Sequence, residues 1–278
     1  MADTAFQTQF RQEFIAGFEQ KQSFLRATVT TEAVIKGNEA VFLVADTGDA
    51  EAVTRGVNGL IPARTDNLTQ PTATLKEWHD KPRKTQFNIF GSQGDGRRIM
   101  QENTRKVLNR KIDQDIISIL NTGTVNTGAA VTASLAWVAK IRAMLGNAEV
   151  DTDELDNMFA VATPAVEAYL LQVKEFSSAE YVDVKPFTGP AVKMRRWAGF
   201  NWIFHSRLPG RGTNAEKCFF YHRNAVGHAA NTGEMSVLAG YNEEDDYYWS
   251  RASIFMGGAK LQNAGIVIGN HDGSAFAA

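Results

Sequence analysis

The sequence predicts an α+β fold in which helices lie between sets of mostly antiparallel strands. Three features support this prediction: a helical period of apolar residues from 96 to 123, period-two alternation from 36 to 95, and strand-like runs separated by turn residues beyond 192. With 278 residues the chain can form one large domain or two smaller ones, each with its own core.

The composition indicates a soluble, unsecreted protein. No apolar run approaches the roughly 20 residues that span a bilayer, and the chain does not start with a basic region followed by an apolar one, as a signal peptide would. A single cysteine, Cys218, cannot form an internal disulfide, which suits a reducing compartment. These observations argue against membrane proteins and secreted disulfide scaffolds.

The amino-terminal segment carries a phenylalanine at every fourth position. This spacing places the rings on one face of a helix, while polar residues occupy the other faces. The helix could bind a membrane surface, pack on the parent fold or dock on a neighbouring subunit. We favour the subunit, because a membrane-surface helix would carry more Lys and Arg on its polar face. The rings are those of Phe6, Phe10, Phe14 and Phe18.

Residues 36 to 95 alternate apolar and polar positions in short runs, which is typical of a long hairpin with a wide tip. An isolated two-stranded ribbon has no second layer to pack on, so another surface must cover it. The runs are Glu39 to Ala45, Thr72 to Trp78 and Thr85 to Phe90.

The tip of this hairpin, residues 58 to 67, places Leu60, Ile61 and Pro62 where a monomer would keep polar residues. The tip could fold back on its own core, because scattered exposed apolar residues are normal. We favour contact with another copy of the chain.

Residues 96 to 123 are predicted to form one amphipathic helix, which would be about 38 Å long at 1.5 Å per residue. One apolar stripe of this helix is expected to pack on a core, and the other faces are polar. The stripe comprises Ile99, Met100, Val107, Leu108, Ile112, Ile116, Ile119 and Leu120.

The second half of the chain is predicted to alternate helices and strands. Helices are expected from 134 to 145, from Pro164 to about 174 with Thr163 as N-cap, and from 223 to 230. Strands are expected at 157–162, 192–197, 200–205, 217–221, 234–241, 247–255 and 265–269.

Charge is unevenly distributed along the chain. Residues 71 to 111 carry ten Lys and Arg against four acids, whereas residues 147 to 183 carry nine acids and one lysine. The split can indicate complementarity between subunits, a basic face toward nucleic acid, or two solvated surfaces with no common purpose. The sequence contains no basic recognition helix, zinc-finger spacing or RNA-binding aromatic motif. A protein that binds a specific nucleic-acid sequence is therefore not indicated.

No pattern of catalytic or metal-binding residues emerges. His205, Cys218, His222 and His228 could be zinc ligands, but their spacing matches no common zinc signature. In strands, positions i and i+4 lie about 13 Å apart, too far for one ion. Cys218 lacks a local partner for nucleophilic catalysis, and the turn at 91–96 has no phosphate-loop spacing. We expect no metal, no cofactor and no catalysis, and we interpret Asp245 and Asp246 as part of an acidic turn.

Four sequence segments, in their order along the chain, resemble segments of the major capsid proteins of tailed double-stranded DNA phages, which have the HK97-type fold. The order of elements also fits: a helical arm, a long hairpin, a long helix, a mixed region and closing strands. The four segments run from Asn109 to Ile117, from Trp197 to Pro209, from Lys217 to Gly227 and from Phe255 to Ile268.

The resemblance implies an HK97-like capsid fold with family-defined segments. These are an N-terminal arm at 1–35, the extended E-loop with its flanking strands at 36–95, the spine helix of the P-domain at 96–122, mainly A-domain at 123–225, and a return to the P-domain at 226–278.

The resemblance also implies a function and a set of partners. Subunits would assemble as hexamers and pentamers in the host cytoplasm into the icosahedral capsid of a virion, around packaged double-stranded DNA. A separate scaffolding protein and a portal are the expected partners, with a decoration protein as a further one. Some members cross-link a loop lysine to a neighbour's asparagine, but no local motif here indicates that chemistry.

Within such a shell we expect the basic residues Arg97, Arg98, Arg105 and Lys106 to face the interior or a neighbour's acidic patch, such as Asp151, Asp153 and Glu154. Contact with DNA would be independent of sequence. Two other classes remain open: an encapsulin-like nanocompartment shell, which shares the fold, and a soluble enzyme of unrecognised type. A cargo-signal peptide on a neighbouring enzyme would indicate the first, and a monomer with a ligand-bearing cleft the second.

Overall fold

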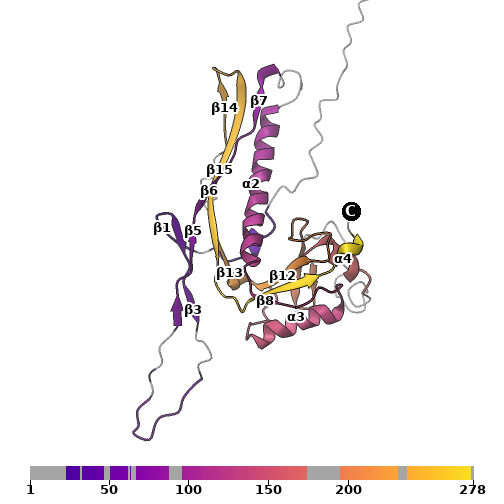
Figure 1. Cartoon of the computed structure of the whole chain (residues 1–278). Helices are drawn as coiled ribbons and strands as arrows, with labels where there is room; N and C mark the ends of the chain where they lie inside the picture. Colours follow the sequence, from indigo (N-terminus) through magenta and orange to yellow (C-terminus); the bar gives the residue numbers. More distant parts are fainter. Residues whose placement is uncertain are drawn as a thin grey trace, which may run out of the picture. The chain divides into compact units, whose positions relative to one another are not determined.

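A computed structural model of the chain describes residues 23–31, 33–46, 51–61, 63, 67–87, 96–173, 195–230 and 237–276 (Figure 1). The described residues fall into two compact units. Unit 1 holds those within 23–24, 76–114 and 230–256, and unit 2 holds those within 25–75, 115–229 and 257–276. Helices and several sheets are present, as predicted for the α+β class.

Unit 1 is built on the long strand β15. Antiparallel strands pair with β15 on both of its sides, β14 on one side and β6 and β7 on the other. Alternate residues of β15, namely Ser250, Ala252, Ile254 and Met256, are buried. The strands are β6 (Lys76–Asp80), β7 (Arg83–Thr85), β14 (Val237–Asn242) and β15 (Tyr247–Lys260), whose last residues belong to unit 2.

Helix α2 (Gly96–Leu120) confirms the long helix predicted at 96–123, and Figure 1 shows it running alongside the strands of unit 1. The ammonium group of Lys111 lies 3.9 Å from the ring centre of Trp78 on β6. Most of the predicted stripe is buried, but Val107 is 36% exposed. The helix ends before Gly123, whose N–H donates to the Leu120 carbonyl oxygen.

Unit 2 contains a six-stranded mixed sheet in the order β10-β11-β9-β12-β16-β8. The pairs β11–β9 and β16–β8 are parallel and the others antiparallel. The strands are β8 (Val125–Asn126), β9 (Met158–Ala162), β10 (Arg195–Trp197), β11 (Phe200–Phe204), β12 (Glu216–His222) and β16 (Ile266–His271).

Two helices complete the core of unit 2, α3 (Leu135–Asn147) and α4 (Pro164–Leu170). The Ser134 side chain caps α3 by accepting a hydrogen bond from the Trp137 N–H. Aromatic side chains fill the core: Phe220 lies edge-on to both Trp137 and Trp202, with ring centres 5.4 and 5.6 Å apart. One face of the sheet is therefore closed by residues of the same chain.

Smaller elements of unit 2 form a ribbon. Strands β1, β2 and β5 make one sheet, and β3 pairs with β4, so residues 39–46 lie opposite 67–74. This part of the predicted hairpin is confirmed. The strands are β1 (Val34–Lys36), β2 (Glu39–Val41), β3 (Val44–Asp46), β4 (Asn67–Thr69) and β5 (Thr72–Thr74).

The structure differs from the sequence predictions in several places. The helix predicted from Pro164 to about 174 ends at Leu170. The helix predicted at 223–230 is wrong beyond its first turn: η2 (Arg223–Ala225) is a short 3-10 helix and β13 (Val226–Ala230) is a strand that pairs with β15. Within the predicted E-loop, β6 and β7 pair with β15, and β7 ends at Thr85, where the third predicted run begins.

Two further 3-10 turns are present, η1 (Arg26–Thr28) and η3 (Ser274–Phe276). Among the described residues no helix has the length and apolar character needed to cross a bilayer.

Candidate assembly surfaces

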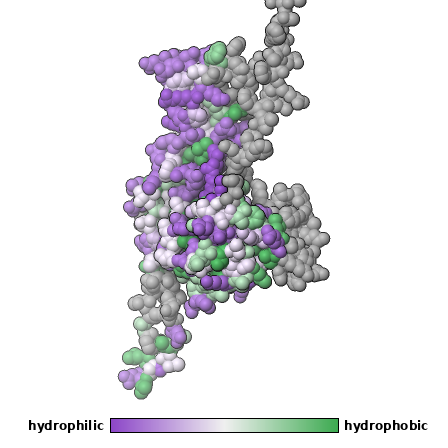
Figure 2. Space-filling model, turned by 45° about the vertical axis from the view of Figure 1, so that its right-hand side comes forward, coloured by the Kyte–Doolittle hydropathy of each residue, from purple (hydrophilic) through white to green (hydrophobic). Residues whose placement is uncertain are grey.

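The described residues 51–61, here called the loop tip, are all exposed. Leu60 is 74% exposed and Ile61 is 67% exposed, and Val53 and Val57 are exposed in the same way. In Figure 2 hydrophobic residues appear at the bottom of the view, at the loop tip, next to hydrophilic ones. Pro62, predicted to share this surface, lies outside the described residues.

Backbone hydrogen bonds give the loop tip a defined turn. The Gly56 N–H donates to the Leu60 carbonyl oxygen at 3.0 Å, and the Gly59 N–H donates to the Gly56 carbonyl oxygen at 2.8 Å. Gly59 has φ of 73°, which a residue with a side chain rarely adopts. The apolar side chains are therefore displayed on a turned segment, and no part of the described chain buries them.

Strands β3 and β4, here called the stem, continue the apolar surface. Leu68 lies opposite Ala45 in the ladder, so these two project from one face, and Leu43 directly precedes β3. Leu43 is 71% exposed and Leu68 is 72% exposed. Sequence inspection missed this surface, although the period-two spacing of Leu43 and Ala45 could have indicated it.

The base of the ribbon, in contrast, is packed. Ala40, Phe42, Ala73 and Ala229 form a buried cluster. A Cβ atom added to Gly227 on β13 would lie 2.6 Å from the Phe42 ring, so only glycine allows this ring to lie against the strand. The ribbon is thus anchored at one end and bare at the other.

The predicted basic cluster on α2 is only partly described. Arg105 is exposed, Lys106 is only 6% exposed, and the side chains of Arg97 and Arg98 lie outside the described residues. Lys106 therefore presents little of its side chain to a partner. Whether these residues face DNA stays a prediction.

The predicted phenylalanine stripe, Phe6, Phe10, Phe14 and Phe18, lies outside the described residues. The chain is described from Ser23, whose hydroxyl donates to Asp113 Oδ1 on α2 at 2.5 Å. The Phe24 N–H donates to Asp113 Oδ2 at 3.2 Å. A buried carboxylate on α2 thus holds the described start of the chain.

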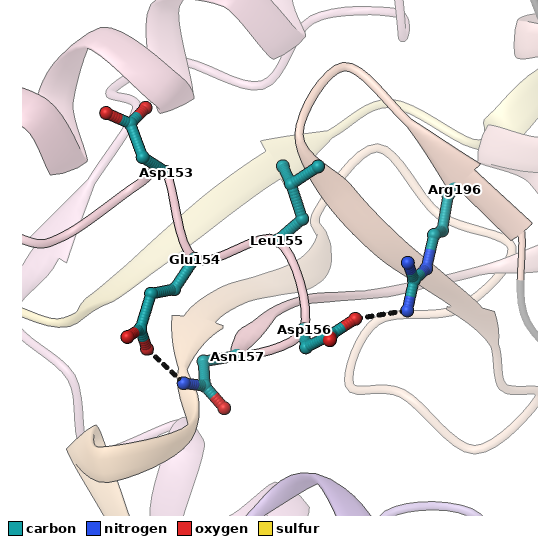
Figure 3. A pocket seen from close by; sticks show the side chains of 6 residues that line it. All are labelled: Asp153, Glu154, Leu155, Asp156, Asn157 and Arg196. Atoms are coloured by element: carbon teal, nitrogen blue, oxygen red, sulfur yellow. Dashed lines mark hydrogen bonds and ion pairs between the residues drawn. The ribbon is translucent and has the colours of Figure 1, made fainter.

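Two residues of the predicted acidic patch, Asp153 and Glu154, line an open depression of about 520 Å³ in unit 2, and Asp151 is not among its lining residues (Figure 3). Asp156 pairs with Arg196, and Asn157 donates a hydrogen bond to Glu154. In Figure 3 the Asp153 carboxylate points away from Arg196. Negative charge therefore dominates this surface, and burial lowers the pKa of His222, with Glu154 and Asp151 acting in the opposite direction.

The structure keeps the four potential zinc ligands engaged elsewhere. The ring nitrogens Nδ1 of His205 and His222 accept backbone N–H groups of Arg207 and Asn224, and His228 lies 3.3 Å from Asp115. Burial raises the pKa of Cys218 to about 12, so its thiol stays protonated at neutral pH. Within the described ranges no group of three His, Cys, Asp or Glu is placed to hold a metal ion.

An anchored ribbon with a bare apolar tip, beside a helix-backed sheet, is an arrangement suited to subunit assembly. A model of the phage capsid protein family matches residues 2–272. The chain belongs to this family. It is a structural major capsid protein, and the copies associate into the shell of a virion.

Solved structures share the fold of this capsid protein. The structure described as Mycobacterium phage Che8 matches with a TM-score of 0.73 and 16% identity, covering 96% of this chain and 98% of that one. The capsid of the cyanophage P-SCSP1u matches with a TM-score of 0.70 and 12% identity, covering 96% and 93%. The capsid of Ralstonia phage GP4 matches with a TM-score of 0.63 and 11% identity, covering 98% of each chain. No curated protein sequence matches the chain significantly.

Proposed function

We propose that this capsid protein assembles as hexamers and pentamers into an icosahedral shell that encloses phage double-stranded DNA, and that the loop tip makes a contact between subunits. The observation that supports the contact is the exposure of Leu60 and Ile61 on a turn fixed by backbone hydrogen bonds. The encapsulin-like alternative is not favoured by the family match.

The energetic argument rests on burial. Removing an aliphatic side chain from water contributes about 1.5 to 3 kcal/mol when it is fully buried. For Leu60 and Ile61 this contribution is absent in the free subunit, because both stay exposed there. Assembly would bury them in every copy, so a small gain per subunit is repeated around the whole shell.

The test replaces Leu60 and Ile61 together with serine. We expect the unfolding temperature of the unassembled subunit to stay nearly unchanged and the yield of closed shells to fall sharply. Circular dichroism melts measure the first quantity and electron-microscope counts of shells the second. As a matched control, Leu135→Ser removes an aliphatic side chain from the exposed first turn of α3 and should leave both quantities unchanged. A double variant that melts early yet assembles normally would contradict the proposal.

We also propose that packaged DNA is contacted without sequence specificity by the basic start of α2, including Arg105, which is exposed. Such contacts act by release of counterions and weaken steeply with salt. Changing Arg97, Arg98 and Arg105 to glutamate should lower DNA retention in shells and flatten its salt dependence. The matched control is Arg211→Glu, an exposed cation of unit 2. Unchanged retention in the triple variant would refute this role.

A separate scaffolding protein, a portal and a decoration protein complete the proposed partners, with assembly in the host cytoplasm. These proposals rest on the resemblance to tailed-phage coat proteins. Expression of the capsid protein alone, and again with its neighbouring phage genes, tests them. Uniform closed shells from the capsid protein alone would show that no separate scaffold is required.

A further inference from the structure

The sheet of unit 1 has two faces. On the second face, no helix or strand among the described residues forms a covering layer. Side chains alternate between the two faces of a strand, and the buried face of β15 carries Ser250, Ala252 and Ile254. Tyr247, Trp249 and Arg251 must therefore project from the opposite face. The ladder adds Arg83, opposite Trp249, and Leu238, opposite Arg251.

Cations on this face lie on aromatic rings. The Lys81 ammonium is 5.1 Å from the ring centre of Trp249, and the Arg83 guanidinium is 4.9 Å from that of Tyr247. Arg251 is exposed beside them and Leu238 is 46% exposed. We call Lys81, Arg83, Leu238, Tyr247, Trp249 and Arg251 the cation–aromatic face.

A glycine fixes the position of the indole on this face. A Cβ atom added to Gly240, which lies opposite Trp249 in the ladder, would be 2.6 Å from the ring. The Trp249 ring therefore lies directly over the backbone of β14 and forms a flat support for Lys81. Lys81, Arg83 and Arg251 form no ion pair with a carboxylate among the described residues, so their charge is available to a partner.

The same hairpin ends in a turn of opposite charge. Glu243, Glu244, Asp245 and Asp246, here called the acidic turn, are all exposed, and none of them forms an ion pair within the described part of the chain. Four adjacent carboxylates repel one another, and a cationic partner would relieve this repulsion.

Hydrogen bonds hold the acidic turn in one conformation. Asn242 Oδ1 accepts from the Glu244 N–H at 2.9 Å, and the Tyr241 hydroxyl donates to Asp246 Oδ1 at 2.6 Å. The bond to Asp246 raises the pKa of Tyr241 to about 12, so this donor is retained at every physiological pH. A turn preorganised in this way loses little conformational freedom on binding.

We propose that the acidic turn of one subunit docks on the cation–aromatic face of a second copy. Each copy carries both surfaces, neither surface is neutralised by an ion pair among the described residues of its own subunit, and their charges are complementary. The inference rests on the self-association of this capsid protein. Duplex DNA is a less suitable occupant, because the acidic turn directly precedes Tyr247 and would repel phosphates brought to this end of the face.

The experiment reverses the charge of the cation–aromatic face, of the acidic turn, or of both. The face variant carries Lys81→Glu, Arg83→Glu and Arg251→Glu, the turn variant carries Glu243→Lys, Glu244→Lys and Asp245→Lys, and a combined variant carries all six. We expect each single-surface variant to lose closed shells and the combined variant to regain them, as counted by electron microscopy. Circular dichroism of the unassembled subunits checks folding.

Lys76→Glu serves as a matched control. Lys76 is exposed on β6 but lies opposite Met256, on the other face of the sheet, and its reversal should leave shell yield unchanged. Folded single-surface variants without rescue in the combined variant would overturn the proposal. It would also be overturned if the face variant assembled normally and lost only DNA retention, since the face would then bind nucleic acid.

The outcomes also separate this inference from the proposed function. Wild-type subunits that form no shell even with co-expressed partners would refute both. Wild-type shells that disappear in the Leu60 and Ile61 variant, together with a combined charge variant that shows no rescue, would refute only the docking of the acidic turn.

Discussion

Strand β9 and the loop tip are both short stretches with aliphatic residues, and they differ in what covers them. All five residues of β9 are buried, between β11 and β12. The described residues 51–61 are all exposed. The same kind of side chain thus stabilises the subunit in one place and is exposed in the other, where we propose that a second copy covers it. Apolar character alone does not distinguish the two; the availability of a covering layer does.

The contrast extends to polar groups. In the core of unit 2 the buried carboxylate of Glu216 is satisfied by three donors or ring atoms: the Thr163 hydroxyl at 2.6 Å, the Gly212 N–H at 2.7 Å and the His271 Nδ1 atom at 2.8 Å. A buried charge without such partners would be strongly destabilising. The buried carboxylate of Glu216 is therefore satisfied within the chain, whereas the loop tip leaves Leu60 and Ile61 in water.

The largest expected effect that tests this contrast is Trp202→Ala. Trp202 is fully buried, packs against Phe220, and its indole N–H donates to the Trp197 carbonyl oxygen at 3.0 Å. We expect the free energy of unfolding to fall by about 3 to 5 kcal/mol, measured by denaturant unfolding of the unassembled subunit. Assembly should fail only as far as folding fails. A fall in unfolding free energy no larger than that of the Leu60 and Ile61 variant would contradict the assignment of Trp202 to the core.

The smallest expected effect concerns the reactivity of Cys218. Its thiol is buried in β12, and burial raises its pKa to about 12, so little thiolate is present at neutral pH. A thiol reagent should label folded subunits slowly and unfolded subunits rapidly, as measured by mass spectrometry. The Leu60 and Ile61 variant should label as slowly as the wild type. Rapid labelling of folded wild-type protein would show that the core opens locally.

Local sequence patterns predicted the helices that depend on neighbouring residues, through their apolar period or the residues at their ends. The 3.6-residue period predicted α2 from residue 96, and a helix was expected from 134, where the structure shows Ser134 as the N-cap of α3. Thr163 and Pro164 marked the start of α4, but the Thr163 hydroxyl bonds Glu216 and does not cap the helix. A capping residue read from sequence can thus be recruited by a buried group 53 positions away.

Elements stabilised by distant partners could not be predicted in this way. After Val226 the segment consists of glycine, histidine and two alanines, which carry no strand signal, yet residues 226–230 pair with β15. The pairing of β6 with β15 joins residues more than 170 positions apart, such as His79 and Ser253. For the assembly surfaces, the sequence indicated Leu60 and Ile61, but the exposure of the stem and the opposition of Gly240 to Trp249 became visible only with the strand register.

The bare loop tip makes its own stabilisation a matter of mass action. A contact that exists only between copies contributes nothing in dilute solution and grows with subunit concentration. If the loop tip makes the proposed contact, Leu60 and Ile61 set a concentration threshold for assembly: below it they remain in water and the ribbon relies on its packed base alone. Above it, each added subunit supplies the proposed covering surface, so growth of the shell depends on the local supply of subunits.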